Sequence, residues 1–360
     1  NYGGLTRVSV TSPLDQGNYT GDPNAVRVTI TQKVKTFISS LFLGQPEVTI
    51  YVAATATTRE VGPACVLSLV GTLTLSGSST VNVPGCVLAS NSRNEPSLNA
   101  NLNGNPDTKS VTAAALYGVG TVNATGNIDA AVMGNQVTPL SDPFKDRMPV
   151  VNPTCSGTGI QAKSLNDSIA SSTTANPLTF GTGDTINPNN ICGGNGNPYS
   201  SNPQNSITVG VGQALNLRPG TYIFYNTSLN VQGTLTCAGC TLVFAGDKPG
   251  IIDVTSDATV QISAPTVGDF VDVLIYRVAE DPVPQNPHVS KLNGNSQSYF
   301  TGGIYMPTGE LIFNGTSTSE VQCTPIVAHT ITFSGTNNTV GGCASNNPFV
   351  QRVRIVRLVE

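Results

Sequence analysis

Charged side chains are scarce in this 360-residue chain, in which Lys and Arg number 17, Asp and Glu number 21, and the four types make up 11%. A typical soluble domain carries roughly 25% charged residues. The formal net charge of -4 leaves no basic surface for phosphates, which excludes an ordinary nucleic-acid-binding protein. Trp is absent and aromatic residues make up 6%, which argues against the aromatic-lined sites of carbohydrate-processing enzymes.

Long apolar runs are missing as well. No run reaches the length of about 18 apolar residues that a transmembrane helix requires. The sequence begins at Asn1 without a signal peptide, so we expect that an export or anchor segment has been removed. Hydrophobic residues still make up 38%, which argues against charge-driven disorder. With 37 Gly, 24 Pro and many Thr, Ser and Asn residues, the composition favours a β protein.

Eight cysteines, an even number, are spread along the chain and favour an oxidising, extracytoplasmic compartment. Their spacing does not decide their connectivity. Buried free thiols, which behave as small apolar side chains, are the alternative for at least one pair. We expect neighbours along the chain to pair: Cys65 with Cys86, Cys155 with Cys192, Cys237 with Cys240, and Cys323 with Cys343.

Residues 1–60 are predicted to form a small α+β domain. Apolar and polar residues alternate over 26–30 and again over 48–56, as in half-buried strands. Between these segments, apolar residues recur at helical spacing and predict one short amphipathic helix. The stripe on this helix comprises Val34, Phe37, Ile38, Leu41 and Phe42.

In residues 61–360, a short motif of apolar, polar, apolar, polar and Gly residues replaces the helical signal. The motif occurs at 73–77, 122–126, 229–233, 311–315 and 331–335. Short strands that end at Gly corners, without helices between them, predict a right-handed parallel β-helix in which each coil buries its inward residues against the next. An antiparallel β-sandwich is the alternative, although hairpin dipeptides are rare.

Two segments depart from this pattern and are predicted as long loops, at about 139–206 and 279–298. Alternation over 350–359 predicts a closing strand with Arg352, Arg354 and Arg357 on a solvated face. We expect the N-terminal domain to cover the first coil of the β-helix, since an open strand edge invites pairing.

Several segments, taken in order, resemble the Tad (tight adherence, Flp-type) pilus-assembly proteins of the TadG class. The resemblance covers most of the chain, and its strength lies in the ordered set rather than in any one segment. The segments are NAVRVTI at 24–30, VTIYVAATAT at 48–57, PACVLSL at 63–69, PGC at 84–86, LSDPF at 140–144, LRPGTY at 217–222, GIYMP at 303–307, LIFNG at 311–315, CTPIVAHTITFSG at 323–335 and VRLVE at 356–360.

This resemblance implies a minor pilin-like or tip subunit that is exported to the periplasm, cell surface or pilus of a bacterium. Its implied partners are other pilin-like subunits, a surface or glycan receptor, and the inner membrane through an N-terminal anchor that this sequence lacks. The family supplies no catalytic residues. We therefore expect a structural, non-enzymatic protein that acts in pilus assembly or adherence and binds no nucleic acid.

The sequence contains few residues that could form a catalytic or metal-binding site. Acidic side chains are scattered, whereas polysaccharide hydrolysis or lysis needs paired carboxylates or a Ca²⁺ cage. Asp253 and Asp257 bracket a turn and form a weak candidate site for Ca²⁺, and no other cofactor is expected. Asx turns are the simpler interpretation of these aspartates.

His288 and His329 lack neighbours at metal-ligand spacing, so we interpret both as structural. The Cys-x-x-Cys spacing of Cys237 and Cys240 lies between strands, which favours a structural disulfide over a redox centre. Two alternatives from other functional classes remain: a carbohydrate-binding or carbohydrate-active β-helix protein, and an adhesin unrelated to pili.

Overall fold

The computed structural model divides into two compact units, Asn1–Val61 with Val353–Glu360, and Gly62–Arg352. The described residues are 6–35, 47–77, 80–102, 110–136, 138–151, 155, 159–183, 188–194, 196–199, 202–314, 324–334 and 349–359. Within these ranges, no helix combines the length and the hydropathy that a membrane crossing requires.

The first unit contains an antiparallel sheet. Strand β2 pairs on one side with β1 and on the other with the N-terminal part of β3. The strands that contribute to this unit are β1 (Thr6–Thr11), β2 (Ala25–Lys35), β3 (Glu47–Ser68) and β26 (Gln351–Leu358). The predicted helix is not borne out at Val34, which lies in β2, and its other stripe residues Phe37, Ile38, Leu41 and Phe42 lie outside the described residues.

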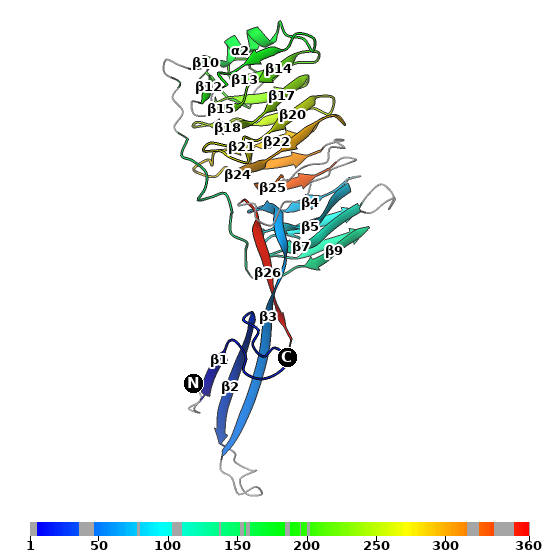
Figure 1. The fold of residues 1–360 in the computed structure, drawn as a ribbon, viewed down its shortest axis with the longest axis vertical. Helices are drawn as coiled ribbons and strands as arrows, with labels where there is room; N and C mark the ends of the chain where they lie inside the picture. Colours follow the sequence, from blue (N-terminus) through cyan, green and yellow to red (C-terminus); the bar gives the residue numbers. More distant parts are fainter. Residues whose placement is uncertain are drawn as a thin grey trace. The chain divides into compact units, whose positions relative to one another are not determined.

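The second unit is a parallel β-helix (Figure 1). Every strand pairing recorded within its described residues is parallel, so the prediction of a parallel β-helix is confirmed and the antiparallel sandwich is wrong. Its first half comprises the C-terminal part of β3, β4 (Leu73–Leu75), β5 (Thr80–Ser90), β6 (Leu98–Leu102), β7 (Ser110–Gly118), β8 (Val122–Gly126) and β9 (Ile128–Met133).

The second half begins with a short strand and a helix and continues as coils, most of which have three strands each. The elements at its start are β10 (Ile160–Gln161), α2 (Ala162–Ile169), β11 (Leu178–Phe180), β12 (Asn189–Cys192), β13 (Ser206–Val209) and β14 (Ala214–Leu217). The next coils are β15 (Gly220–Tyr225), β16 (Ser228–Val231), β17 (Thr234–Ala238), β18 (Cys240–Ala245), β19 (Ile252–Val254) and β20 (Thr259–Ser263). The last elements are β21 (Val273–Arg277), β22 (Val289–Leu292), β23 (Tyr299–Thr301), β24 (Gly303–Phe313) and β25 (Ile326–Phe333).

The coils are not stacked in chain order. In the longest parallel sheet the strands follow one another as β10, β12, β15, β18, β21, β24, β25, β3, β5, β7 and β9. The first coil of the chain therefore lies in the middle of the stack, between β25 and β5 (Figure 1). The expectation that the first coil has an open edge is wrong, because β25 and β5 pair with its two sides.

The five sequence motifs form rungs of one sheet, which runs β13, β16, β19, β22, β24, β25, β4, β6, β8. Their third residues share one interior row, in which Phe313 pairs with Phe333 and Phe333 with Leu75. Their second residues form an outward row on the same strands. The members of this outward row are Thr208, Asn230, Asp253, Lys291, Ile312, Thr332, Thr74, Asn99 and Asn123.

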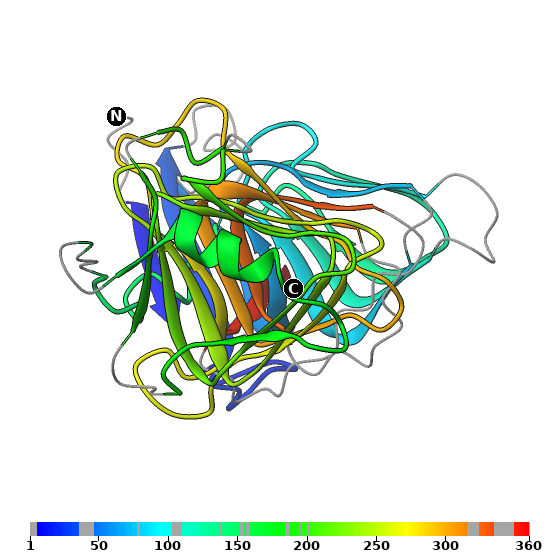
Figure 2. The same ribbon diagram turned by 90° about the horizontal axis from the view of Figure 1, so that it is seen from above.

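Helix α2, which the sequence analysis missed, covers one end of the coils (Figure 2). Its inward side chains Ala162, Leu165 and Ile169 are buried in the core. The side chain of Asn166 donates a hydrogen bond to the Ser206 carbonyl (2.6 Å) and accepts one from the Thr208 N–H (2.8 Å). Asn166 thus occupies the backbone groups of β13 that a further strand would otherwise bind.

The segment 139–206, predicted as one long loop, contains α2 and the strands β10, β11 and β12, so that prediction is wrong from Ile160 onward. Turns interrupt the alternation of apolar and polar residues in this segment, so the sequence pattern does not reveal these short elements. The second predicted loop, 279–298, contains β22. Both segments therefore contribute rungs to the β-helix.

Residues 138–149, here called the strap, lie against strands from both halves of the stack. The side-chain amide of Asn91 donates to the Leu140 carbonyl (2.7 Å) and accepts from its N–H (2.8 Å). Phe144 stacks on Tyr305 with 4.9 Å between ring centroids, and the Tyr305 hydroxyl donates to Asp142 (2.8 Å). Burial and the nearby Asp142 carboxylate raise the pKa of Tyr305. The strap thereby connects Asn91, which follows β5 in the first half, with β24 of the second.

Three of the four expected disulfides are present: Cys65–Cys86, Cys155–Cys192 and Cys237–Cys240, with Cα atoms 5.5, 5.8 and 6.0 Å apart. The first joins neighbouring coils, and the second ties the segment before α2 to β12. The fourth expected pair, Cys323 with Cys343, lies outside the described residues.

Substitution Asn166→Ala should destabilise the β-helix, because it leaves the Thr208 N–H and the Ser206 carbonyl without their partner. We expect the free energy of unfolding in urea to fall by about 1–3 kcal/mol. The matched control is Asn123→Ala, an outward amide at the opposite end of the stack that bonds only to another side chain, Asn99. Equal stability of the two variants would contradict the capping role of Asn166.

Candidate functional site

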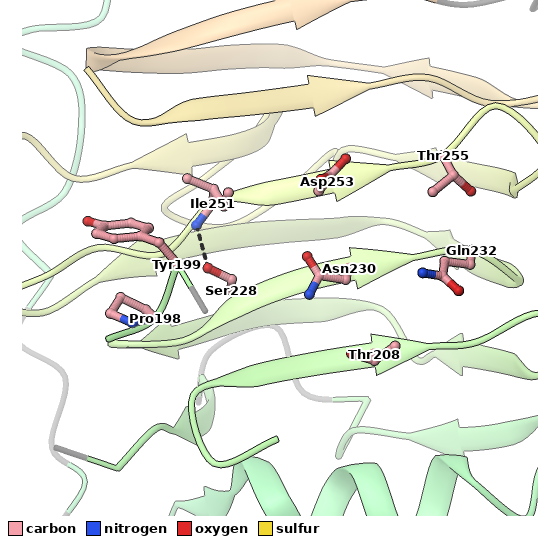
Figure 3. Close-up of a pocket in the computed structure, with 9 residues that line it drawn as sticks. All are labelled: Pro198, Tyr199, Thr208, Ser228, Asn230, Gln232, Ile251, Asp253 and Thr255. Atoms are coloured by element: carbon pink, nitrogen blue, oxygen red, sulfur yellow. Dashed lines mark hydrogen bonds between the residues drawn. The ribbon is translucent and has the colours of Figure 1, made fainter. Parts of the chain in front are cut away.

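A polar groove of about 490 Å³ lies on the outward face of β13, β16 and β19 (Figure 3). Its floor carries Thr208, Asn230 and Asp253, which are register partners on adjacent strands. The alternation that buries Leu229 and Val231 turns Asn230 outward, and the same holds on the neighbouring rungs. The full lining is Pro198, Tyr199, Thr208, Ser228, Asn230, Gln232, Ile251, Asp253 and Thr255.

The groove lining combines hydroxyl, amide and carboxylate groups without a cation. The Asn230 amide is oriented by a hydrogen bond to the Ser206 hydroxyl (2.6 Å), and the Ser228 hydroxyl accepts one from the Ile251 N–H (3.0 Å). Asp253 differs from these residues, since its carboxylate has no hydrogen-bond or ion-pair partner in the part of the chain that the structure describes. A ligand in the groove would therefore meet a negatively charged hydrogen-bond acceptor, the carboxylate of Asp253.

The two residues of the candidate Ca²⁺ site belong to different features of the surface. Asp253 lies on the groove floor, whereas Asp257 lies on the exposed turn after β19 and is not part of the lining. No cluster of three or more His, Cys, Asp or Glu residues that could hold a metal ion is found among the described ranges. The Ca²⁺ site stays a prediction without further support.

Tyr199 lies at one end of the groove beside Ile251 (Figure 3), and a buried ionic cluster holds it there. Its hydroxyl lies 3.1 Å from the Pro249 carbonyl and 3.3 Å from a Glu280 carboxylate oxygen. Its ring stacks on His288 with 3.5 Å between centroids. Burial raises the pKa of Tyr199 to about 12, so its phenol is neutral at physiological pH.

Arg277 organises this cluster from a fully buried position. Its guanidinium donates to the carbonyls of Pro249 (2.9 Å) and Gly250 (3.0 Å) and forms an ion pair with Glu280 at 2.9 Å. A buried cation with several charge-assisted partners fixes the geometry of everything bonded to it. The loop that carries Tyr199 is therefore tied to the coil that carries Arg277.

The structural role predicted for His288 and His329 stays a prediction, and the structure adds their surroundings: His288 stacks on Tyr199, and both rings are partly buried. Burial lowers the pKa of both His288 and His329, and in His288 it outweighs the opposing charge of Glu280. His329 contacts the Thr330 hydroxyl at 3.0 Å. Among the described residues, Glu280 is the acid recorded in an ion pair with Arg277, while Asp269 and Asp272 lie in a turn before β21.

The sequence predicts Asp253 as a candidate site residue, but it predicts neither the groove nor the lining residues Tyr199 and Asn230. The signal for Asn230 was present, because it is the second residue of the motif at 229–233, whose second positions point outward. Tyr199 carried no comparable signal. It reaches the groove through contacts with Pro249 and Arg277, which are distant in sequence.

Comparison with known proteins gives no relative: no protein-family model, no curated protein and no solved structure matches the chain. The class of protein therefore rests on the fold and the disulfides. The chain is a parallel β-helix protein with three described disulfides, which indicate an oxidising, extracytoplasmic environment.

Substitution Arg277→Met should strongly destabilise the protein, because it leaves the buried Glu280 carboxylate without its cation. Removing one partner of a buried ion pair costs about 3–5 kcal/mol, which urea unfolding would detect. Lys291→Met is the matched control, since Lys291 is exposed and none of the ion pairs among described residues involves it. A loss below about 0.5 kcal/mol in Arg277→Met, the size of an ordinary surface change, would contradict the role of Arg277.

Proposed function

We propose that the first unit binds other protein subunits through one face of its antiparallel sheet, which is apolar and open to solvent. Cross-strand register places Val8, Ile30 and Val52 side by side, and their strand neighbours at even positions share that face. Nine residues of this apolar face are 37% to 66% exposed: Val8, Val10, Val26, Val28, Ile30, Val34, Val48, Ile50 and Val52.

The opposite face of the same sheet carries polar and basic residues, among them Arg27, Thr29 and Thr31. A sheet normally buries its apolar face against another layer. Large contiguous apolar patches on a monomer mark interaction sites. The contrast between the two faces supports a role for the apolar one in binding another protein layer.

We propose that the chain is a non-catalytic structural subunit on the outside of a bacterial cell, of the Tad pilus type that its sequence resembles. It docks to neighbouring subunits through the apolar face of β1, β2 and β3. The observation that carries this proposal is that face, since its exposed β-branched side chains can pack against a second apolar layer. The disulfide-bonded β-helix is then the part that remains free for contacts outside the assembly.

The double variant Ile30→Thr/Val52→Thr should abolish docking while the sheet still forms, because Thr keeps the β-branched shape and adds a hydroxyl to the apolar face. Deletion of the gene in its bacterium should remove surface pili in electron micrographs. We expect the wild-type gene to restore them and the double variant to fail. The matched control Thr31→Ser alters the opposite face of β2 and should restore pili fully.

Circular dichroism and thermal unfolding of the purified double variant distinguish lost docking from lost folding. Gold-labelled antibody against the β-helix should mark filament tips or bases in the wild type. Normal pili in the deletion strain, together with gold spread over the envelope of the wild type, would overturn the pilus assignment in favour of a pilus-independent adhesin.

A further inference from the structure

The groove on β13, β16 and β19 carries polar side chains that the fold itself does not need. The interior row beneath it provides the packing, and backbone pairing provides the strand order. Outward side chains at these positions are therefore available to bind a ligand. Three adjacent rungs present a hydroxyl, an amide and a carboxylate from Thr208, Asn230 and Asp253.

The charge of the groove restricts which classes of ligand can bind there. Asp253 is its one ionisable acid or base apart from the phenol of Tyr199, and no Lys or Arg lines it. An anionic ligand would have to approach the unpaired carboxylate of Asp253, and the cation next to it on the outward row, Lys291 on β22, lies outside the groove lining. Nucleic acids, phosphates and acidic polysaccharides are therefore disfavoured, and an uncharged ligand rich in hydroxyl groups is favoured.

The spacing of the polar groups favours an extended ligand with a regular repeat. Adjacent strands lie roughly 4.8 Å apart, a spacing close to the length of one pyranose ring along an oligosaccharide. A carboxylate accepts hydrogen bonds through two oxygens, and an amide both donates and accepts, so each matches the donor and acceptor pattern of neighbouring sugar hydroxyls.

The aromatic ring of Tyr199 gives the groove an apolar wall at one end (Figure 3). Arg277 and Glu280 fix its position, so it is available without further ordering. The C–H faces of a sugar ring pack on such a surface by dispersion. A fixed aromatic ring beside a row of polar groups therefore matches both surfaces of a pyranose.

An extended peptide fits the groove less well. Peptides add to sheets through open backbone edges, but the open edge of β13 is occupied by Asn166 from α2. The other two strands of the floor have strand partners on both sides. The groove offers side chains rather than backbone groups.

We infer that this groove binds a neutral oligosaccharide, with Asn230 and Asp253 holding its hydroxyl groups and Tyr199 packing against one ring. This site is independent of subunit docking, because its residues all belong to the β-helix unit and none lies on the apolar face of the first unit. The inference goes beyond the proposed structural role, because it names the class of molecule that the β-helix binds.

The test uses the full chain and a panel of neutral hexasaccharides: cellohexaose, maltohexaose, xylohexaose and chitohexaose, with hexagalacturonic acid as the acidic comparator. Saturation-transfer NMR identifies binders, and isothermal titration calorimetry measures Kd. We expect at least one neutral sugar to bind with Kd below about 1 mM and the acidic comparator to bind more weakly.

Variants Asn230→Ala and Asp253→Ala should each weaken that binding by roughly tenfold, the effect of losing one hydrogen bond to a charged or well-oriented group. Asn123→Ala is the matched control, because Asn123 occupies the same outward row outside the groove, and its affinity should equal that of the wild type. Absence of any neutral binder, tighter binding of the acidic comparator, or equal affinity in all three variants would overturn the inference. Pilus counts for the same variants should stay normal, so failure here is distinguishable from failure of the proposed docking role.

Discussion

The pairing of the last coil with the first is the interaction on which the β-helix depends. Strand β25 binds the C-terminal part of β3 and also β4, although these strands lie at opposite ends of the unit's sequence. Backbone bonds from Leu69 to Ala328 (2.8 Å) and from Ser76 to Phe333 (2.9 Å) extend this seam beyond the ladder. Across it the interior row continues from Phe333 to Leu75. Without this seam, each half would end in an unpaired strand edge with its core open to water.

The seam also accounts for the remaining architecture. Because the chain enters the stack in its middle, it must cross to the far end before it can build the second half, and the strap lies along that crossing. Contacts of the strap with Asn91 and Tyr305 then connect strands on the two sides of the seam. At the far end, β10 begins the second half, and α2 covers the coil that contains β13. The groove follows from the same stacking, since parallel register is what places Thr208, Asn230 and Asp253 on one face and at regular spacing.

The sequence predicted the local parts of this structure better than their connections. Alternating motifs such as 229–233 and 331–335 determine which side chain turns inward, so their strands and their parallel class could be predicted. Three cysteine pairs followed from proximity along the chain. The order of coils could not be predicted, because a rung carries the same pattern wherever it lies in the stack. The helix α2 is only eight residues long and carries Lys163 and Asp167 on its exposed side, so its periodicity is too short to recognise. The hydrogen bond from Arg277 to the Tyr199 hydroxyl joins residues far apart in sequence, so no local sequence pattern predicts it.

Hydrogen exchange followed by mass spectrometry tests the stacking order most directly. Amide protection in a cooperative stack is lowest at its ends and highest in its middle. The structure predicts that peptides from β25 and from β3 and β4, over 326–333 and 64–75, exchange last, while those from β9 and β10 exchange first. Rapid exchange over 326–333 and 64–75 with strong protection of β9 and β10 would contradict the seam, because it would place the first and last coils at open ends.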